Sequence, residues 1–235
     1  MAEIPTLIRR LPTAESESGC ADDSLAALFH ELFPRESAKP LAYRKRAYIF
    51  HQGGAVESVW CVLSGMVALE RIDEDGRMAI FGIMKAGTVL AWHDLIEGGC
   101  YRNSAETLSA CEVVSVSRGV FLDALRGDER LVGSLMRQAA AQVGAYEEHI
   151  LRLSTLEVPQ RLYSTLCSMA EKAEDGDEGE DGMVEFSVPV LRRDLAAMIG
   201  TSPEGVSRGI RRLEEMDVAE FSGRSTVRLR VPPRR

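Results

Sequence analysis

Glu204, Ser207 and Arg208 have the residue types and the spacing expected for contact with another molecule. Their separations of three and one residues place them on one side of a helix, which turns once every ~3.6 residues. An arginine offers paired donors to guanine, a glutamate accepts a hydrogen bond from cytosine, and a serine can bond to either kind of base edge. We therefore expect this side of the helix to read DNA base edges.

Polar and basic residues near that helix suit contacts to the DNA backbone. Hydroxyl and guanidinium groups bind phosphate oxygens, and such contacts position a protein on DNA without reading its sequence. The candidates for this role are Arg192, Arg193, Thr201, Ser202, Arg211, Arg212 and Arg224.

Helix signals on both sides of Gly200 predict a helix-turn-helix. The first helix covers Leu191–Ile199. Ser202-Pro203-Glu204 then combines a capping side chain, a first-turn proline and an acid near the positive end of the helix dipole, so a second helix begins there and runs to about Glu215. The strands predicted around this pair, which make the motif winged, are Val184–Val188, Val218–Phe221 and Thr226–Val231.

Charge is divided unevenly along the chain. The 235 residues include 28 Lys+Arg and 36 Asp+Glu, a formal net charge of -8. From Phe186 to Arg235, ten arginines and no lysine stand against six acidic residues, an excess of four positive charges. The remainder holds 18 basic and 30 acidic residues, a net charge of -12. This polarity indicates two domains with different partners, of which only the C-terminal one suits nucleic acid.

A second pattern suits contact with an identical helix. Asp128–Leu156 contains no proline and is predicted to form one long helix. Seven apolar residues within it are separated alternately by four and three positions, which is the repeat of a coiled-coil seam. These residues are Val132, Met136, Ala139, Val143, Tyr146, Ile150 and Leu153. We expect this seam to join two copies of the chain; packing of the helix on its own domain is the alternative.

The region from Ala38 to about Val120 has short β-rich runs separated by glycine-containing turns, typical of an antiparallel jelly roll. Asp75-Gly76 within it predicts a type I′ hairpin turn. The predicted fold class is α+β, with an N-terminal antiparallel β jelly-roll sensor, a long dimerisation helix and a C-terminal winged helix-turn-helix. The expected parts are an arm and helix over residues 1–37, the sensor over 38–127, the dimerisation helix over 128–157 and the winged domain over 158–235.

Several classes of protein are disfavoured. No apolar run reaches the ~18 residues that span a membrane, and the N-terminus lacks the apolar segment of a signal peptide. The five cysteines include no CxxC pair, so we expect no structural zinc, no disulfide framework and a cytoplasmic location. No P-loop, nucleophile elbow, paired-carboxylate cleft or metal cluster indicates an enzyme.

The order of these parts resembles the Crp/Fnr family of bacterial transcription regulators, over roughly Leu41 to Val231. The segments that carry the resemblance are Ala47–Leu63 with Ser64-Gly65, Gly87, Ala110-Cys111-Glu112-Val113 and Pro203-Glu204-Gly205-Val206-Ser207-Arg208. The last is similar to the recognition-helix signature "E..SR" of the Fnr-type branch. It implies a homodimer on a palindrome resembling TTGAT-N4-ATCAA, with half-sites about one helical turn apart. Glu204 and Arg208 would read the central G·C pair, Ser207 would lie near thymine, and RNA polymerase would be a further partner.

The resemblance also directs attention to the jelly roll as a sensor. The effector-site candidates are Gly87, Thr88, Trp92, His93 and Arg102. Members that bind cyclic AMP have a glutamate after the glycine and a later Arg-Ser pair. Here Thr88 follows Gly87 and Asn103 follows Arg102, which disfavours cyclic AMP.

The resemblance also raises two metal cofactors, an iron–sulfur cluster and haem. A [4Fe–4S] cluster needs four ligands, normally thiolates. Cys20 and Cys111 lack the further cysteines found in oxygen-sensing members, which disfavours such a cluster. A redox pair formed by Cys20 and Cys111 is the remaining alternative. His93 lies six residues after Gly87, as a histidine does in the carbon-monoxide-sensing member, so it is a candidate haem ligand. A histidine that caps a loop or is hydrogen-bonded at the barrel edge is the alternative.

These observations favour a homodimeric DNA-binding regulator controlled by an unidentified small-molecule or gas effector. The competing hypothesis is a small-molecule or haem-binding sensor module that acts through protein contacts, with a structural winged domain.

Overall fold

A computed structural model describes residues 23–34, 38–170, 177–178, 182–188, 190–222 and 226–231. The chain forms two compact units that divide between Tyr146 and Glu147. Most of the predicted N-terminal arm, including Cys20, lies outside the described residues, as does Arg224. None of the described helices is long and apolar enough to cross a membrane.

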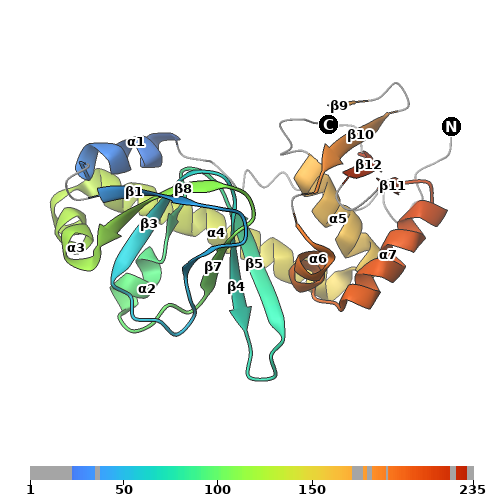
Figure 1. Cartoon of the computed structure of the whole chain (residues 1–235), viewed down its shortest axis with the longest axis horizontal. Coiled ribbons are helices and arrows are strands. Elements are labelled where there is room, and N and C mark those ends of the chain that lie inside the picture. The colour runs from blue at the N-terminus through green and yellow to red at the C-terminus, as the bar shows by residue number, and fades with distance from the viewer. Residues whose placement is uncertain are drawn as a thin grey trace. The chain divides into compact units, whose positions relative to one another are not determined.

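The first unit is built around two β-sheets (Figure 1). Its elements are α1 (Asp23–Leu32), β1 (Ala38–Tyr43), β2 (Tyr48–Phe50), β3 (Ser58–Ser64), β4 (Val67–Ile72), β5 (Met78–Met84), β6 (Val89–Leu90), α2 (Trp92–Glu97), β7 (Ser104–Thr107), β8 (Cys111–Ser117), α3 (Arg118–Gly127) and the first part of α4 (Glu129–Thr155).

The two four-stranded sheets have strand orders β1-β8-β3-β6 and β2-β7-β4-β5, with antiparallel neighbours throughout. Apolar residues of both sheets, such as Val59, Val67 and Val113, share one buried core with α1 and α3. The predicted antiparallel jelly roll is confirmed. β1, α2 and α3 do not follow from the sequence patterns, because β1 contains a proline, α2 spans six residues and α3 contains two glycines.

The β4–β5 hairpin differs from its prediction in turn type. A type I′ turn needs positive φ at both central residues, but of Asp75 and Gly76 only Gly76 has it, at 77°. The carboxylate of Asp73 instead accepts hydrogen bonds from the backbone N–H groups of Asp75 and Arg77, at 3.0 and 2.8 Å. This side chain organises a longer turn in which a single glycine supplies the left-handed residue.

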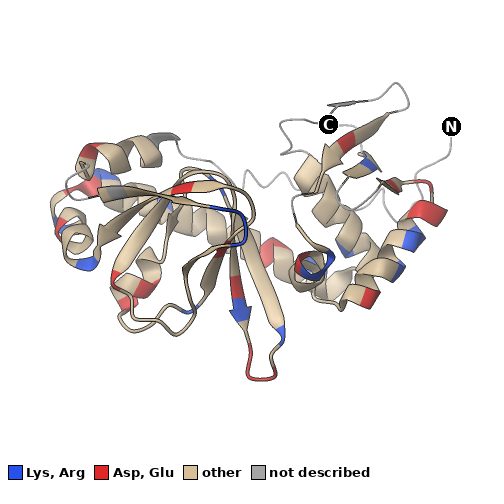
Figure 2. Ribbon diagram, viewed as in Figure 1, with Lys and Arg blue, Asp and Glu red and all other residues tan. Residues whose placement is uncertain are grey.

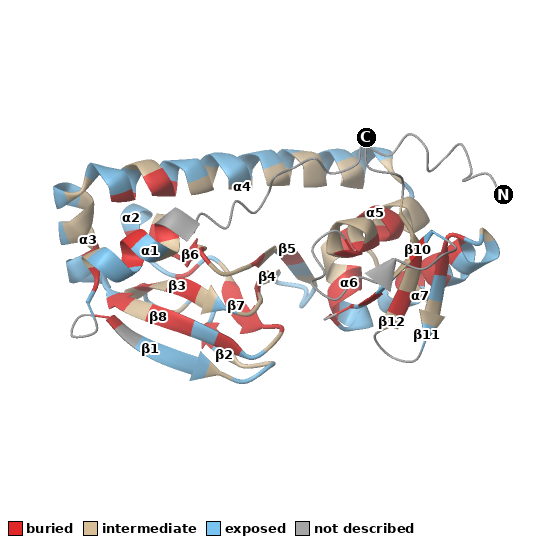
Figure 3. Ribbon diagram, turned by 90° about the horizontal axis from the view of Figure 1, so that it is seen from above, coloured by how far each residue is buried: buried red, intermediate tan, exposed pale blue. Residues whose placement is uncertain are grey.

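The predicted long helix is confirmed as α4. Its start is fixed by Asp128, whose carboxylate accepts hydrogen bonds from the backbone N–H groups of Arg130 and Leu131 at 2.8 and 3.3 Å. Leu131 and Leu135 are buried in the jelly-roll core, and Figure 3 shows that the buried part of α4 is confined to its N-terminal turns.

The second unit is a winged helix-turn-helix, as predicted. Its elements are the last turns of α4, α5 (Val158–Ala170), β9 (Asp177–Glu178), β10 (Met183–Ser187), α6 (Arg192–Ile199), α7 (Pro203–Glu215), β11 (Ala219–Ser222) and β12 (Thr226–Arg230). The sheet order is β11-β12-β10-β9, so the strand before the helix pair joins the hairpin that follows it.

Helix α5 supports this unit from within. Gly209 of α7 lies against it, since a Cβ at that position would meet Leu162 Cδ2 at 3.2 Å. The hydroxyl of Tyr163 donates a hydrogen bond to the carbonyl of Arg230 at 2.6 Å, which ties α5 to β12. Val206, Ile210 and Leu213 of α7 are buried, so the opposite side of α7 faces outward.

Candidate DNA-binding interface and sensor site

The start of α7 is fixed by the residues that the sequence pattern indicates. The hydroxyl of Ser202 accepts a hydrogen bond from the backbone N–H of Gly205 at 3.2 Å, and Pro203 occupies the first turn. A Cβ on Gly205 would overlap Thr201 Oγ1 and lie 3.3 Å from its Cβ and Cγ2. The turn between the two helices therefore packs directly on the first turn of α7.

Glu204, Ser207 and Arg208 come together on the outward side of α7. Glu204 and Arg208 are exposed, whereas Ser207 is half-buried and donates a hydrogen bond to the carbonyl of Pro203 at 3.0 Å. A hydrogen bond from its own backbone N–H lowers the pKa of Glu204, and Ser202 and the charge of Arg208 act in the same direction. Glu204 is thus held as a charged acceptor beside a charged donor.

The candidate phosphate ligands surround this trio on α6, the turn and α7. Arg192, Arg193 and Arg211 are exposed, and Figure 2 shows the positive charges on the turns of α6 and α7. Arg212 is exposed but pairs with Glu215, with 3.0 Å between Nη1 and Oε2. Of the two turn residues, Ser202 is exposed and Thr201 is half-buried.

The predicted seam divides into two groups. Val132, Met136, Val143 and Ile150 expose between 38% and 61% of their surface. Ala139, Tyr146 and Leu153 are half-buried against their own chain, and Ala139 packs on the jelly-roll core. Burial also raises the pKa of Tyr146. The four exposed residues, called here the exposed row of α4, therefore form an apolar stripe of the kind that marks an interface.

The candidate effector residues lie around β6 and α2. Gly87 and Ala91 both have positive φ, 85° and 62°, a conformation that is uncommon for alanine. The carbonyl of Thr88 accepts a hydrogen bond from the backbone N–H of Val62 at 3.0 Å. Trp92 then starts α2 and is only 7% exposed, and its Nε1 has no hydrogen-bond partner among the described residues.

Arg102 is already paired with carboxylates. Its Nε lies 2.7 Å from Asp94 Oδ1, and its Nη2 lies 3.3 Å from Glu97 Oε2. Asp94 is 4% exposed and also accepts a hydrogen bond from the backbone N–H of Arg102 at 3.3 Å. A phosphate would compete with these two carboxylates for the Arg102 guanidinium, which disfavours recognition of a cyclic nucleotide through Arg102.

The two candidate metal ligands have other contacts. His93 Nε2 lies 3.4 Å from Asp94 Oδ1; burial lowers the pKa of His93, and the charge of Asp94 opposes this. Cys111 is 4% exposed, and its thiol donates a hydrogen bond to the carbonyl of Met66 at 3.3 Å. Across the described part of the chain, no group of three or more His, Cys, Asp and Glu side chains could hold a metal ion. Among the described residues, neither His93 nor Cys111 therefore belongs to a group of three or more side chains that could hold a metal ion.

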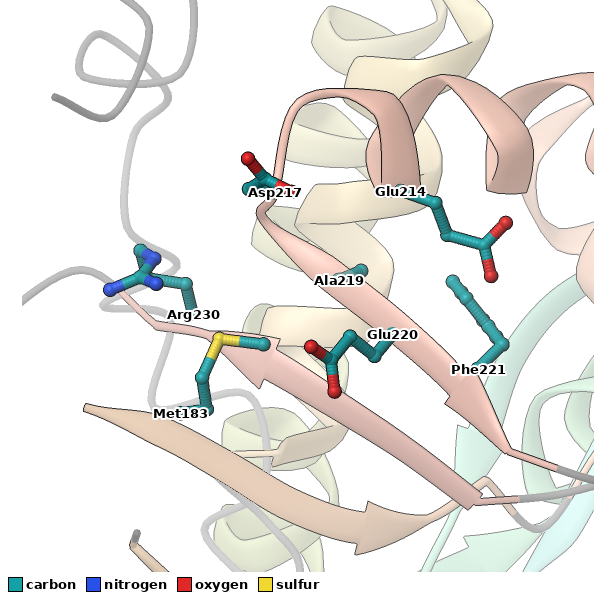
Figure 4. Close-up of a pocket in the computed structure, with 7 residues that line it drawn as sticks. All are labelled: Met183, Glu214, Asp217, Ala219, Glu220, Phe221 and Arg230. Carbon is teal, nitrogen blue, oxygen red and sulfur yellow. The ribbon is translucent and has the colours of Figure 1, made fainter. Parts of the chain in front are cut away.

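A cavity of about 450 Å³ lies elsewhere, in the winged unit (Figure 4). Its lining residues are Met183, Glu214, Asp217, Ala219, Glu220, Phe221 and Arg230. It lies at the C-terminal end of α7, away from Glu204, and its three carboxylates would repel a polyanion. None of the effector-site candidates lines it.

Three residues with structural roles at these sites do not stand out in the sequence. Asp194 is 1% exposed and accepts a hydrogen bond from the backbone N–H of Leu191 at 2.8 Å, which caps α6; an acid three positions after a helix start is the available signal. Gly205 permits the close turn described above. Gln138 contacts β6 from α4, and nothing in its local sequence indicates this.

Two family models match the chain. The Cyclic nucleotide-binding domain matches residues 40–128, and the Crp-like helix-turn-helix domain matches residues 160–234. Together they span most of the chain, in the order seen in the structure.

Curated proteins and solved structures agree with these matches. The chain is 29% identical over 191 residues to nitrogen fixation regulation protein FixK of Azorhizobium caulinodans, covering 81% of this chain and 75% of FixK. It is 26% identical to the cAMP-activated global transcriptional regulator CRP of Salmonella typhimurium, covering 79% and 87% of the two chains. The structure of FixK2 from Bradyrhizobium japonicum superposes with a TM-score of 0.68 at 26% identity, covering 82% and 92%. The chain therefore belongs to the Crp/Fnr family of transcription regulators.

Proposed function

We propose that this chain is a homodimeric, sequence-specific regulator that inserts α7 into the major groove of DNA. The observation that carries the proposal is the trio Glu204, Ser207 and Arg208 on the outward side of a helix whose other side is buried. A relative named as a nitrogen fixation regulator and another named as a global transcriptional regulator support the same role.

The expected target is a palindrome resembling TTGAT-N4-ATCAA. The guanidinium of Arg208 would donate to guanine O6 and N7, and Glu204 would accept from the paired cytosine. The lowered pKa of Glu204 supports this role, because the carboxylate must be ionised to act as an acceptor only. Ser207 would lie beside a neighbouring thymine.

Backbone contacts would come from Arg192, Arg193, Thr201, Ser202, Arg211, Arg212 and Arg224. Each phosphate neutralised by an arginine releases counterions, so the affinity should fall as salt rises. The rest of the chain carries a net charge of -12, so attraction to DNA depends on the placement of these few arginines.

Dimerisation would use the exposed row of α4, with Ala139, Tyr146 and Leu153 at its edge. A two-fold axis between two copies of α4 would present two copies of α7 to successive major grooves, which is what a palindrome requires. The jelly roll would bind the effector around Gly87, Thr88, Trp92, His93 and Arg102, and RNA polymerase would be a further partner.

The effector class is tested by an absorbance spectrum of the purified protein. Haem bound through His93 would add a Soret band, and an iron–sulfur cluster would add a broad visible shoulder. Because Arg102 is already paired with Asp94 and Glu97, we expect no cyclic-AMP-dependent change in DNA affinity.

The DNA assignment is tested by fluorescence anisotropy with the palindrome and a scrambled duplex at physiological salt. Arg208→Ala should remove most of the preference, by ~1–3 kcal/mol for a paired guanine contact. Arg126→Ala, on α3 of the jelly-roll unit, is the control and should bind as the wild type does. Equal affinity of the wild type for both duplexes would reject the proposed target. No detectable binding to either duplex, at low or at physiological salt, would favour a module that acts through protein contacts.

A further inference from the structure

Gln138 of α4 holds the edge strand β6 with both ends of its side-chain amide. Its Nε2 donates to the carbonyl of Val89 at 2.8 Å, and its Oε1 accepts from the backbone N–H of Val89 at 2.9 Å. Val89 pairs with Cys61 of β3 on its other side. The glutamine thus takes the place of the next strand, and β6 is fixed between the sheet and the helix.

The segment that Gln138 holds is short and bounded by unusual backbone. β6 contains two residues, and the left-handed residues Gly87 and Ala91 stand on either side of it. Trp92 follows at once, with its indole N–H buried and unpaired among the described residues. The effector-site candidates Gly87, Thr88 and Trp92 therefore lie within three residues of the two hydrogen bonds.

The same glutamine lies on the side of α4 that faces the jelly roll. Leu131 and Leu135 attach the first turns through the apolar core, and Gln138 follows on that side of the helix. One turn later Gln142 donates to the sulfur of Met84, at 3.6 Å, and a thioether is a weak acceptor. The two hydrogen bonds of Gln138 are therefore a strong polar attachment between α4 and β6.

We propose that Gln138 is a positioning residue that fixes α4 to the segment Gly87–Trp92, so that a change in this segment alters the exposed row of α4 and thereby the affinity for DNA. The last step rests on the proposed function. Because Gln138 holds Val89, three residues before Trp92, we expect a substitution at Gln138 to change the surroundings of Trp92 as well.

The test compares Gln138→Leu with Gln142→Leu, the same substitution one helical turn later. Trp60→Phe in all variants leaves Trp92 as the sole tryptophan, since the chain has two. Three quantities are measured on the full chain: hydrogen exchange at the Val89 amide, Trp92 emission, and affinity for the palindromic duplex. Gln138→Glu keeps the acceptor for the Val89 N–H and loses the donor.

Gln138→Leu should speed exchange at Val89 by about tenfold, shift Trp92 emission to longer wavelength and change DNA affinity by about fivefold or more. Gln138→Glu should give values between those of the wild type and Gln138→Leu for all three quantities. If the leucine variant does not fold, Gln138→Glu is compared with Gln142→Leu instead. Gln142→Leu should match the wild type within about twofold.

Values for Gln138→Leu equal to those of Gln142→Leu would overturn the proposal. So would faster Val89 exchange with unchanged DNA affinity, because Gln138 would then stabilise β6 without positioning α4. If the wild type shows no preference for the palindrome, the proposed function fails separately, and the dimer dissociation constant from analytical ultracentrifugation replaces DNA affinity in the same comparison.

Discussion

Arg192 of α6 donates a hydrogen bond from Nη1 to Ser207 Oγ of α7, at 3.3 Å. Ser207 donates its own proton to the carbonyl of Pro203. The hydroxyl proposed to lie near thymine is thus used twice within the protein, and a guanidinium assigned to the DNA backbone lies beside it. The two helices of the motif therefore present one linked surface.

This link predicts that substitutions at the two positions are not additive. Arg192→Ala and Ser207→Ala should each weaken binding to the palindrome, and the double variant should lose less than the sum, with a coupling of ~0.5–1 kcal/mol. Anisotropy titrations at two salt concentrations measure the cycle. Arg212→Ala combined with Ser207→Ala is the control pair and should be additive, because Arg212 points away from Ser207 on α7 and pairs with Glu215. Zero coupling for Arg192 would mean that the hydrogen bond has no effect on binding.

Gly205→Ala should destabilise the winged unit and weaken DNA binding. The added methyl group overlaps Thr201 Oγ1, and overpacking of this kind costs ~1–3 kcal/mol. Chemical denaturation followed by circular dichroism measures the free energy of unfolding.

The matched control for that substitution is Gly119→Ala in α3, where nothing lies within 4 Å of the new Cβ. It should be neutral or slightly stabilising, since alanine is the better helix former. Adding Thr201→Ala to Gly205→Ala should restore part of the loss. If Gly205→Ala behaved as Gly119→Ala does, the close turn would not limit stability.

Met136→Glu should shift the chain from dimer to monomer. A charge within an apolar seam loses its hydration when two copies meet, and leaving it buried and unpaired is costly. Sedimentation velocity measures the change. Ile96→Glu is the control, because Ile96 of α2 is 54% exposed and Met136 is 55% exposed; equal sedimentation of both variants and the wild type would exclude the seam.

Stability should fall as the pH is lowered through about 6.5, the usual pKa of histidine. Burial lowers the pKa of His93 and of His149, and Arg152 and Arg161 add to the effect at His149. The unfolded chain then binds more protons in that range, so protonation favours unfolding until the folded pKa values are passed. Melting temperatures between about pH 8 and pH 5.5 should show the decline, and His93→Gln with His149→Gln should flatten it. An unchanged slope in the double variant would assign the decline to other groups.

Local signals in the sequence were sufficient for most of the fold. The cap, proline and acid at Ser202-Pro203-Glu204 predict the start of α7 at Pro203, where the structure has it, because these residues act within one helical turn. The glycine-separated β-rich runs predict the jelly roll, because short strands bounded by turn residues are a local pattern of this fold. β1 and α2 do not follow, since one depends on pairing with the distant β8 and the other follows a left-handed Ala91.

The helical repeat of the sequence is enough to predict which residues lie on the outward side of α7, because that repeat does not depend on the rest of the chain. It also determined the apolar row along α4, but not that Ala139, Tyr146 and Leu153 turn toward their own chain. Three contacts could not be predicted without the folded chain: the pairing of Arg102 with Asp94, the hydrogen bonds between Gln138 and Val89, and the hydrogen bond from Arg192 to Ser207. The first joins α2 to the loop that precedes β7, and the other two join residues of two different elements. The distances between these segments are set by packing of the core, which no local pattern encodes.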